Sequence, residues 1–261
     1  ENASEPMPLV VGSSTVMAMA VATSQPLAAQ AGLHIMRQGG NAVDAAVATA
    51  IAMTVLEPTT NGIGSDAFSL IWFEGKLHGL NGSGRSPHSL APNHFEGKKA
   101  MPSTGWDPVT VPGAVSLWME MSKKFGKLPF KKLFDAAIEY AAHGFPVAPL
   151  TAGLWARALT RYKEFPEWGK TFLIDGRAPK AGEVMRFPHH AATLKEIADG
   201  GGESFYRGDL AKRMVNEAKA GGGLMTMKDL AEHRADWVEP ISIAYRGHRL
   251  HEIPPNGQGI A

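Results

Sequence analysis

Residues 39–46 of the chain read Gly-Gly-Asn-Ala-Val-Asp-Ala-Ala, and this run separates two helices. Its two glycines end a first helix, which the sequence predicts over Leu27–Arg37 with Ser24 as the N-cap. Asn41 caps the second helix, and Asp44 stands three residues later, where a carboxylate accepts hydrogen bonds from free backbone N–H groups. We therefore expect two consecutive helices joined by a tight turn.

The second helix runs through Val55 and consists almost entirely of Ala, Val, Ile and Met. A helix that is apolar all round is buried between layers of structure. Before both helices, Val16–Thr23 is apolar and partly β-branched, which predicts a buried strand. After them comes the glycine-rich turn Asn61–Asp66, and Phe68–Phe73 and Lys76–Leu80 then read as two strands joined by a short turn.

The middle of the chain is mainly helical, with apolar residues at helical spacing separated by glycine and proline. The clearest segments are Ala114–Phe125, Phe130–His143 and Asp209–Ala220. A predicted hairpin, Ile241–Tyr245 and Arg249–Ile253, follows near the end. Strands do not alternate regularly with helices, so a sheet with segregated helices, the α+β class, fits better than a doubly wound sheet.

Composition narrows the classes of function. Of the 261 residues, 44% are hydrophobic and 20% charged, as in an ordinary globular protein. The net charge is +1 and the basic residues are scattered, so we expect no nucleic-acid partner. Cysteine is absent, which excludes disulfides and a cysteine nucleophile. The longest apolar stretch, Ala42–Leu56, contains Asp44 and is too short to span a bilayer, so no membrane association is expected.

Several familiar site motifs fail. Gly62–Ala67 matches the loose dinucleotide pattern, but it follows a helix and precedes a strand, the reverse of a Rossmann turn. Gly169-Lys170-Thr171 resembles the end of a P-loop, but Glu164 stands where the first glycine belongs and would repel phosphate. His189-His190 is the nearest thing to a metal pair, but neighbouring side chains point apart. We therefore expect neither an organic cofactor nor a metal ion.

The loop after the second strand is the strongest candidate for a site. Asn81-Gly82-Ser83-Gly84 has little side-chain bulk, so its backbone N–H groups can approach a ligand closely. Arg85 follows at once, and Pro87 stiffens the exit. A guanidinium recognises a carboxylate in a planar, bidentate manner. Local chemistry alone fits two interpretations equally, a ligand carboxylate or an ion pair with a structural Asp or Glu.

Beyond these features, the chain carries a series of motifs spread over nearly its whole length. Besides residues 39–46 they are Ala22–Ala28, Gly62–Phe68, Val111–Gly113, Gly144-Phe145, Phe205–Gly208, Gly222–Thr226, Asp229-Leu230, Tyr245–Gly247 and Pro254–Gly259. In this order they resemble the γ-glutamyltransferase family, the glutathione hydrolases of the N-terminal-nucleophile superfamily. The resemblance implies an αββα four-layer sandwich, made as a proenzyme that cuts itself before a threonine into a large and a small subunit.

The resemblance also implies that the new N-terminal threonine is the nucleophile, with its own α-amine as the base. No threonine of this chain lies in that motif, so we expect no catalytic residue here. Residues 1–261 would form the large-subunit part of a single domain, incomplete at its C-terminus, where Ile260-Ala261 follows the final hairpin without a closing element. Its partner would be the small subunit from the same precursor, and a dimer of such heterodimers is a further expectation.

Arg85 stands in the place of the arginine that, in this family, binds the α-carboxylate of the γ-glutamyl group. We therefore expect a γ-glutamyl amide hydrolase or acyl transferase whose donor carboxylate is held by Arg85. The setting Gly-Ser-Gly-Arg-Ser-Pro differs from the Arg-Glu common in transpeptidases and resembles the branch with acylases and an oxamate-cleaving enzyme. An amidohydrolase or acylase for an oxamate-like or glutaryl-like amide, or a non-catalytic homologue, is the alternative. The compartment stays open between a bacterial cytoplasm and the periplasm or secretion.

Overall fold

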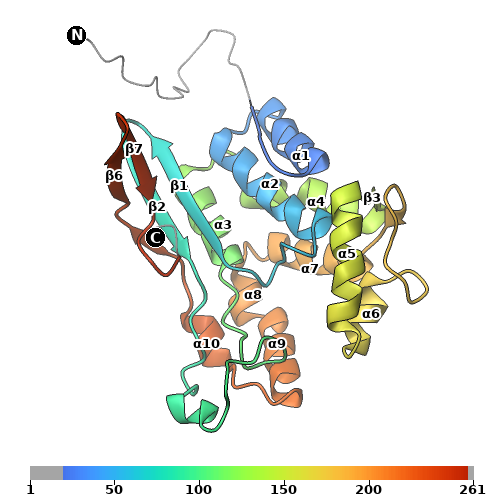
Figure 1. Ribbon diagram of the computed structural model, residues 1–261. Coiled ribbons are helices and arrows are strands. Elements are labelled where there is room, and N and C mark those ends of the chain that lie inside the picture. The colour runs from blue at the N-terminus through green and yellow to red at the C-terminus, as the bar shows by residue number, and fades with distance from the viewer. Residues whose placement is uncertain (1–19, 258–261) are drawn as a thin grey trace.

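The computed structural model describes residues 20–257, in which helices pack on one side of a small antiparallel sheet (Figure 1). The α-helices are α1 (Pro26–Arg37), α2 (Ala42–Leu56), α3 (Ala114–Phe125), α4 (Asp135–His143), α5 (Pro149–Tyr162), α6 (Pro166–Phe172), α7 (Pro188–Asp199), α8 (Glu203–Arg207), α9 (Asp209–Ala220) and α10 (Met227–Glu232). Two 3-10 helices are η1 (Pro92–Phe95) and η2 (Phe130–Phe134). The strands are β1 (Ala67–Phe73), β2 (Lys76–Gly82), β3 (Phe145–Pro146), β4 (Val184–Met185), β5 (Asp236–Val238), β6 (Ile241–Tyr245) and β7 (His248–Glu252).

Helix α2 forms the centre of the core, as its uniformly apolar sequence predicts. It packs against α1 on one side and α3 and α4 on others, and Ile51, Val55 and Leu56 are fully buried. The predicted capping box is confirmed: Asn41 Oδ1 accepts a hydrogen bond from Asp44 N, and Asp44 Oδ2 accepts one from Asn41 N. The backbone N–H groups of Asn41 and Asp44, which have no backbone partner at the helix N-terminus, are thereby both hydrogen-bonded by side chains.

Two expectations concern the segment before α2, of which the strand is contradicted only in its described half and the N-cap is wrong. The predicted strand Val16–Thr23 lies partly outside the described residues, and residues 20–23 form no strand. Thr23 contacts α2 instead of a sheet, because its Oγ1 donates a hydrogen bond to Met53 Sδ at 3.5 Å. Gln25, not Ser24, caps α1, because Gln25 has extended backbone before Pro26 and its Oε1 accepts hydrogen bonds from Leu27 N and Ala28 N.

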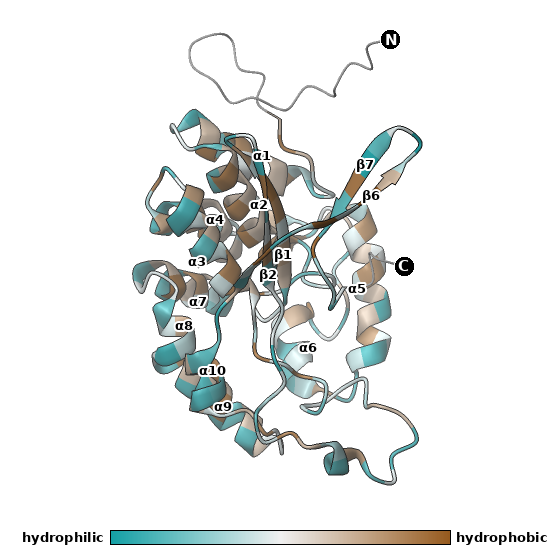
Figure 2. Ribbon diagram, turned by 90° about the vertical axis from the view of Figure 1, so that its left-hand side faces the viewer, coloured by the Kyte–Doolittle hydropathy of each residue, from teal (hydrophilic) through white to brown (hydrophobic). Residues whose placement is uncertain are grey.

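Strands β1 and β2 confirm the predicted hairpin. They pair from Ala67 opposite Gly82 to Phe73 opposite Lys76. One face of the hairpin packs on α3, because the ring of Phe73 lies 4.9 Å from that of Phe125. On the opposite face, Phe68, Leu70 and Trp72 are 48%, 40% and 53% exposed, and no described element covers them. Figure 2 shows β1 as one of the more apolar strands of the chain.

A third strand, β5, extends this sheet and was not predicted. It pairs antiparallel with β2, placing Asp236 opposite Asn81 and Val238 opposite Gly79. The two-residue strands β3 and β4 were missed as well. Three consecutive residues carry too little alternation to indicate a strand, so β5 exists because β2 offers it a free edge.

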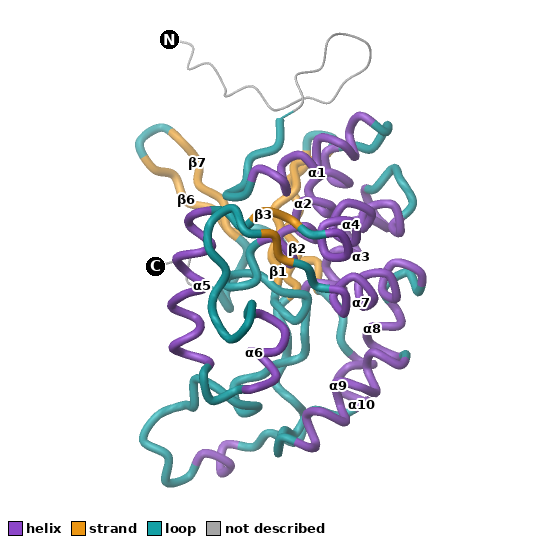
Figure 3. The backbone as a smooth tube through the Cα atoms, turned by 90° about the vertical axis from the view of Figure 1, so that its right-hand side faces the viewer, coloured by secondary structure: helices purple, strands orange, loops and turns teal. Residues whose placement is uncertain are grey.

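The predicted helices at Ala114–Phe125 and Asp209–Ala220 are confirmed with the same bounds. The segment Phe130–His143 divides into η2 and then α4, so its first five residues are wound more tightly than predicted. The final hairpin is confirmed as β6 and β7, one residue earlier in its second strand than expected. Figure 3 shows the helices from α7 to α10 following one another along one side of the chain, with α5 and α6 apart from them.

Candidate functional site

The loop that carries Arg85 is held against a second backbone segment by direct contact. A Cβ atom added to Gly84 would lie 1.7 Å from Val111 O, and one added to Gly113 would lie 1.9 Å from Gly82 O. No side chain fits at either glycine, so residues 82–84 and 111–113 lie backbone to backbone. Val111 N also donates a hydrogen bond to Arg85 O at 3.0 Å, which fixes the main chain of the predicted site residue itself.

Side chains from two further segments hold the same loop. Asp66, on the glycine-rich turn before β1, accepts a hydrogen bond from Gly84 N at 2.7 Å. Asn81 Nδ2 donates to Asn256 Oδ1 at 3.0 Å, and Asn256 in turn donates to Ser83 Oγ. Three separate motifs of the sequence, including the Pro-Pro-Asn-Gly run near the end, therefore converge on the loop that follows β2.

The Arg85 side chain extends from this fixed loop toward solvent, with 69% of it exposed. Its Nη2 lies 2.9 Å from Oδ2 of Asp236, whose side chain is 50% exposed. Asp236 lies on β5 directly opposite Asn81, so the sheet brings together two residues 151 positions apart. Arg85 thus has an acidic neighbour and, at the same time, remains accessible to a ligand.

A buried polar cluster lies beneath the loop. Ser116 Oγ donates to Gly113 O at 2.8 Å and therefore accepts from Nε2 of His233 at 3.1 Å. Tyr206 OH accepts from Ser116 N and donates to Pro112 O at 2.8 Å. Burial, and then the positive charge of Arg85, lower the pKa of His233, which favours the neutral form of its ring. The cluster fixes residues 112 and 113, on which the Arg85 loop rests.

Hydrogen bonds between His88 and Asp229 hold the end of the loop that follows Arg85. Asp229 Oδ1 accepts from both His88 N at 2.8 Å and His88 Nδ1 at 2.6 Å. Burial opposes ionisation of Asp229, but the hydrogen bonds from His88 and Thr226 outweigh it and lower its pKa to about 2. Thr226 and Asp229 form a capping box, so the carboxylate that caps the first turn of α10 also anchors the loop.

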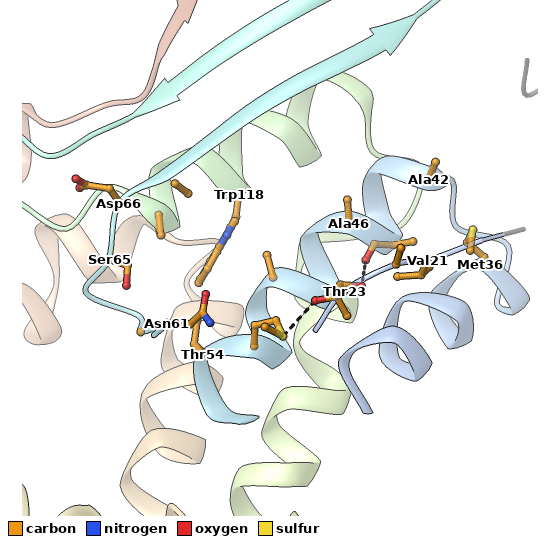
Figure 4. Close-up of a pocket in the computed structure, with 18 of the residues that line it drawn as sticks. Val21, Thr23, Met36, Ala42, Ala46, Thr54, Asn61, Ser65, Asp66 and Trp118 are labelled. Atoms are coloured by element: carbon orange, nitrogen blue, oxygen red, sulfur yellow. Dashed lines mark hydrogen bonds between the residues drawn. The ribbon is translucent and has the colours of Figure 1, made fainter. Parts of the chain in front are cut away.

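A cavity of about 500 Å³ lies next to this loop, between α2 and the start of β1. Figure 4 shows Ser65 and Asp66 at one end of it, with Ala46 of α2 and Trp118 of α3 along its walls. Most of its lining is small and apolar. Asn61, Ser65 and Asp66 make one end polar, and the hydroxyls of Thr23, Thr49 and Thr54 line other parts of it. Since Asp66 also binds Gly84 N, the polar end of the cavity adjoins the Arg85 loop.

The rejected motifs lie away from this site. Gly169-Lys170-Thr171 lies on α6, and His189-His190 lies in the first turn of α7. His190 packs its ring on Phe172 and Phe187. Among residues 20–257, no three His, Asp or Glu side chains are placed to share a metal ion. In the same range, no helix has the length and apolar character needed to cross a membrane.

The sequence predicted Arg85 as a site residue and did not predict the side chains that contact it or its loop. Asp229 could have been recognised from the capping-box spacing of Thr226 and Asp229. Asp236 and His233 have no local pattern that indicates a site. They reach Arg85 only because β5 pairs with β2.

The sequence matches the Gamma-glutamyltranspeptidase family over residues 28–261. It is 37% identical over 237 residues to the glutathione hydrolase-like YwrD proenzyme of Bacillus subtilis (strain 168), covering 90% of this chain and 45% of that protein. It is 36% identical over 249 residues to the oxamate amidohydrolase proenzyme of Klebsiella pneumoniae, covering 93% of this chain and 47% of that protein. A crystal structure of cephalosporin acylase from Bacillus halodurans is similar at a TM-score of 0.89 and 52% identity, covering 100% of this chain and 50% of that one.

The chain spans about half the length of these relatives. The match extends over both segments that meet at the Arg85 loop and over the strand that carries Asp236. The structural similarity confirms the expected α+β fold of the N-terminal-nucleophile hydrolase type. By sequence and by fold, this chain belongs to the γ-glutamyltranspeptidase family.

Proposed function

We propose that this chain is the large-subunit part of an amide hydrolase or acyl transferase in which Arg85 binds the carboxylate of a γ-glutamyl donor. The observation that carries the proposal is the contrast between the backbone and the side chain of Arg85. The backbone carbonyl of Arg85 accepts a hydrogen bond from Val111 N, and the neighbouring Gly84 N donates one to Asp66. The Arg85 side chain, in contrast, is 69% exposed. A rigid loop that presents an accessible guanidinium is suited to charge-assisted binding of a carboxylate.

The nucleophile of this proposal is a threonine on a partner subunit from the same precursor. The two curated relatives described above are named proenzymes, which supports production in precursor form. The exposed apolar face of Phe68, Leu70 and Trp72 supports a partner that packs on β1, because a contiguous apolar face of this kind is a common interaction surface. Residues 1–261 then form one part of a single domain that the partner completes, and pairing of two such complexes remains a prediction.

In the reaction, Arg85 holds and orients the donor while the threonine hydroxyl attacks the amide carbonyl. The amine is released and an acyl-enzyme ester forms on the threonine. Water resolves this ester in hydrolysis, whereas a second amine resolves it in transfer. The residues of this chain contribute binding and orientation, which act by holding the carbonyl at the distance and angle that attack requires.

A second candidate is an acylase or amidohydrolase for another carboxylate-bearing amide. It is favoured by the names of two relatives, a cephalosporin acylase at 52% identity and an oxamate amidohydrolase at 36% identity. Both chemistries need a carboxylate anchor and proceed through an acyl-enzyme ester on the threonine. They differ in the group next to the scissile amide, so donor assays separate them.

The test uses the full-length protein with γ-glutamyl-p-nitroanilide, glutaryl-p-nitroanilide and oxamate as donors. We expect Arg85→Ala to raise KM about tenfold to hundredfold for the donor that is cleaved, because a charge-assisted contact is lost. Arg213→Ala is the matched control, since Arg213 is 64% exposed and forms a 2.9 Å ion pair with Glu196 on the helical side. An Arg85→Ala protein with unchanged KM contradicts the role of Arg85.

Intact-mass analysis with N-terminal sequencing tests the partner. A second polypeptide that begins with threonine is expected in the purified protein. Its absence, together with inactivity toward all three donors, would favour a non-catalytic homologue.

A further inference from the structure

Asp236 occupies a defined position beside Arg85. It lies on β5 opposite Asn81, near the end of β2 and four residues before Arg85, and Asn81 is itself held by Asn256. The backbone of Asp236 is therefore held by the sheet, and the backbone of Arg85 is held by the hydrogen bonds of its loop. The contact joins Nη2 of Arg85 to Oδ2 of Asp236 at 2.9 Å, which is good geometry for an ion pair.

Stability is a poor explanation of this pair. The side chains of Arg85 and Asp236 are 69% and 50% exposed, and ion pairs with such exposure contribute little to folding because water screens them. Lys76 of β2 and Glu239, the residue after β5, form another exposed ion pair at a longer 3.7 Å. Because both pairs are exposed to water, we expect each to contribute little to the stability of the sheet.

The contact leaves most of the guanidinium free. Within residues 20–257, Asp236 is the only side chain that binds it, through one of its three nitrogens. An arginine carries five N–H donors in a rigid plane, and a carboxylate binds to two of them along one edge. A contact at Nη2 restricts the rotation of the plane and leaves further donors for a ligand.

We propose that Asp236 is a positioning residue, which orients the guanidinium of Arg85 so that its free edge faces the donor carboxylate. The inference rests on the proposed function, because it assumes that Arg85 binds the donor. A long exposed arginine samples many rotamers, and holding it in one of them reduces the entropy lost when the donor binds. Asp236 also neutralises part of the local charge, so the site favours a ligand with a single carboxylate.

The test measures KM and kcat of the full-length protein with whichever of the three donors the unaltered protein cleaves. We expect Asp236→Asn to raise KM about fivefold, the scale of one exposed ion pair, and to change kcat by less than about twofold. Asp236→Ala is expected to act in the same direction and serves as a second variant. Glu239→Gln, which removes the other exposed pair of these strands, should leave KM and the melting temperature unchanged.

A double-mutant cycle with Arg85→Lys distinguishes positioning from a general structural effect. A lysine has no planar edge to orient, so Asp236→Asn should add little to the KM of the Arg85→Lys protein. An Asp236→Asn protein with unchanged KM, or with the same added effect in both backgrounds, would overturn the inference. If Arg85→Ala itself leaves KM unchanged, the proposed function fails instead, so the two failures are distinguishable.

Discussion

Asp44 and Lys127 are joined across 83 residues of sequence: both carboxylate oxygens of Asp44 accept a hydrogen bond from Lys127 N, at 3.2 and 3.0 Å. Asp44 is completely buried and also accepts hydrogen bonds from Asn41 N and Leu128 N. The Asp44 carboxylate therefore caps the first turn of α2 and also binds the segment that follows α3. Since α3 supports the sheet and its loop, this link joins the helical core to the site.

Asp44→Asn should destabilise the protein by about 2–4 kcal/mol, because an amide offers one acceptor oxygen and turns an N–H group toward buried N–H donors. Urea unfolding followed by circular dichroism measures the change. Asp135→Asn is the control, since Asp135 begins α4 but is half exposed, and it should cost less than about 1 kcal/mol. Equal losses in the two variants would show that burial of the Asp44 carboxylate is unimportant.

Gly84→Ala should impair donor binding more than folding. Its Cβ would lie 1.7 Å from Val111 O, a backbone atom that cannot rotate away as the end of a side chain can, so the Arg85 loop must move. We expect KM to rise at least about tenfold, since small displacements of an anchoring group weaken orientation. Kinetics with the cleaved donor and a thermal melt separate the two effects, and normal kinetics would mean that the loop accommodates the methyl group.

Gly153→Ala provides the opposite case. Gly153 lies within α5, and an added Cβ meets no atom within 4 Å. Alanine favours a helix over glycine by about 1 kcal/mol, so this variant should be more stable with unaltered KM. A rise in melting temperature is the expected measurement, and a fall would indicate a contact outside the described residues.

The stability of the protein should depend on pH through His233. Its pKa is lowered from 6.5 by burial and by Arg85, so below pH 6.5 the unfolded chain binds a proton that the folded chain does not. The contribution of His233 to the free energy of unfolding is therefore fully present above pH 6.5, and it is lost as the pH falls toward the lowered pKa. His233→Gln keeps a donor for Ser116 and should make this decline shallower between pH 8 and about pH 5. His78 and His190, whose pKa values burial also lowers, account for the remaining slope, and an unchanged slope would exclude His233.

Much of the fold could be predicted because its determinants are local. The capping of α2 depends on Asn41 and Asp44, three residues apart, and its burial on a run of apolar residues. The N-cap of α1 could not be decided in the same way, since Ser24 and Gln25 are both polar and only the backbone before Pro26 selects Gln25. Strand β5 and the partners of Arg85 depend on pairing between distant segments, and no short pattern records it. The sequence therefore predicted Arg85 as a carboxylate-binding residue but not the residues that contact it.

The uncovered face of β1 gives the last prediction, which concerns the partner subunit. Leu70 lies between Phe68 and Trp72 on this face, and all three side chains are exposed among the described residues. If a partner packs there, Leu70→Asp places an unpaired charge in an apolar interface at a cost of roughly 3 kcal/mol or more, which weakens association at least about a hundredfold. Size-exclusion chromatography with intact-mass analysis should then show the two polypeptides separating. Leu150→Asp is the control, since Leu150 is 69% exposed on α5, away from the sheet (Figure 1), and should leave the complex intact. A stable complex carrying Leu70→Asp would place the partner elsewhere, because no apolar interface tolerates a buried carboxylate without a compensating charge.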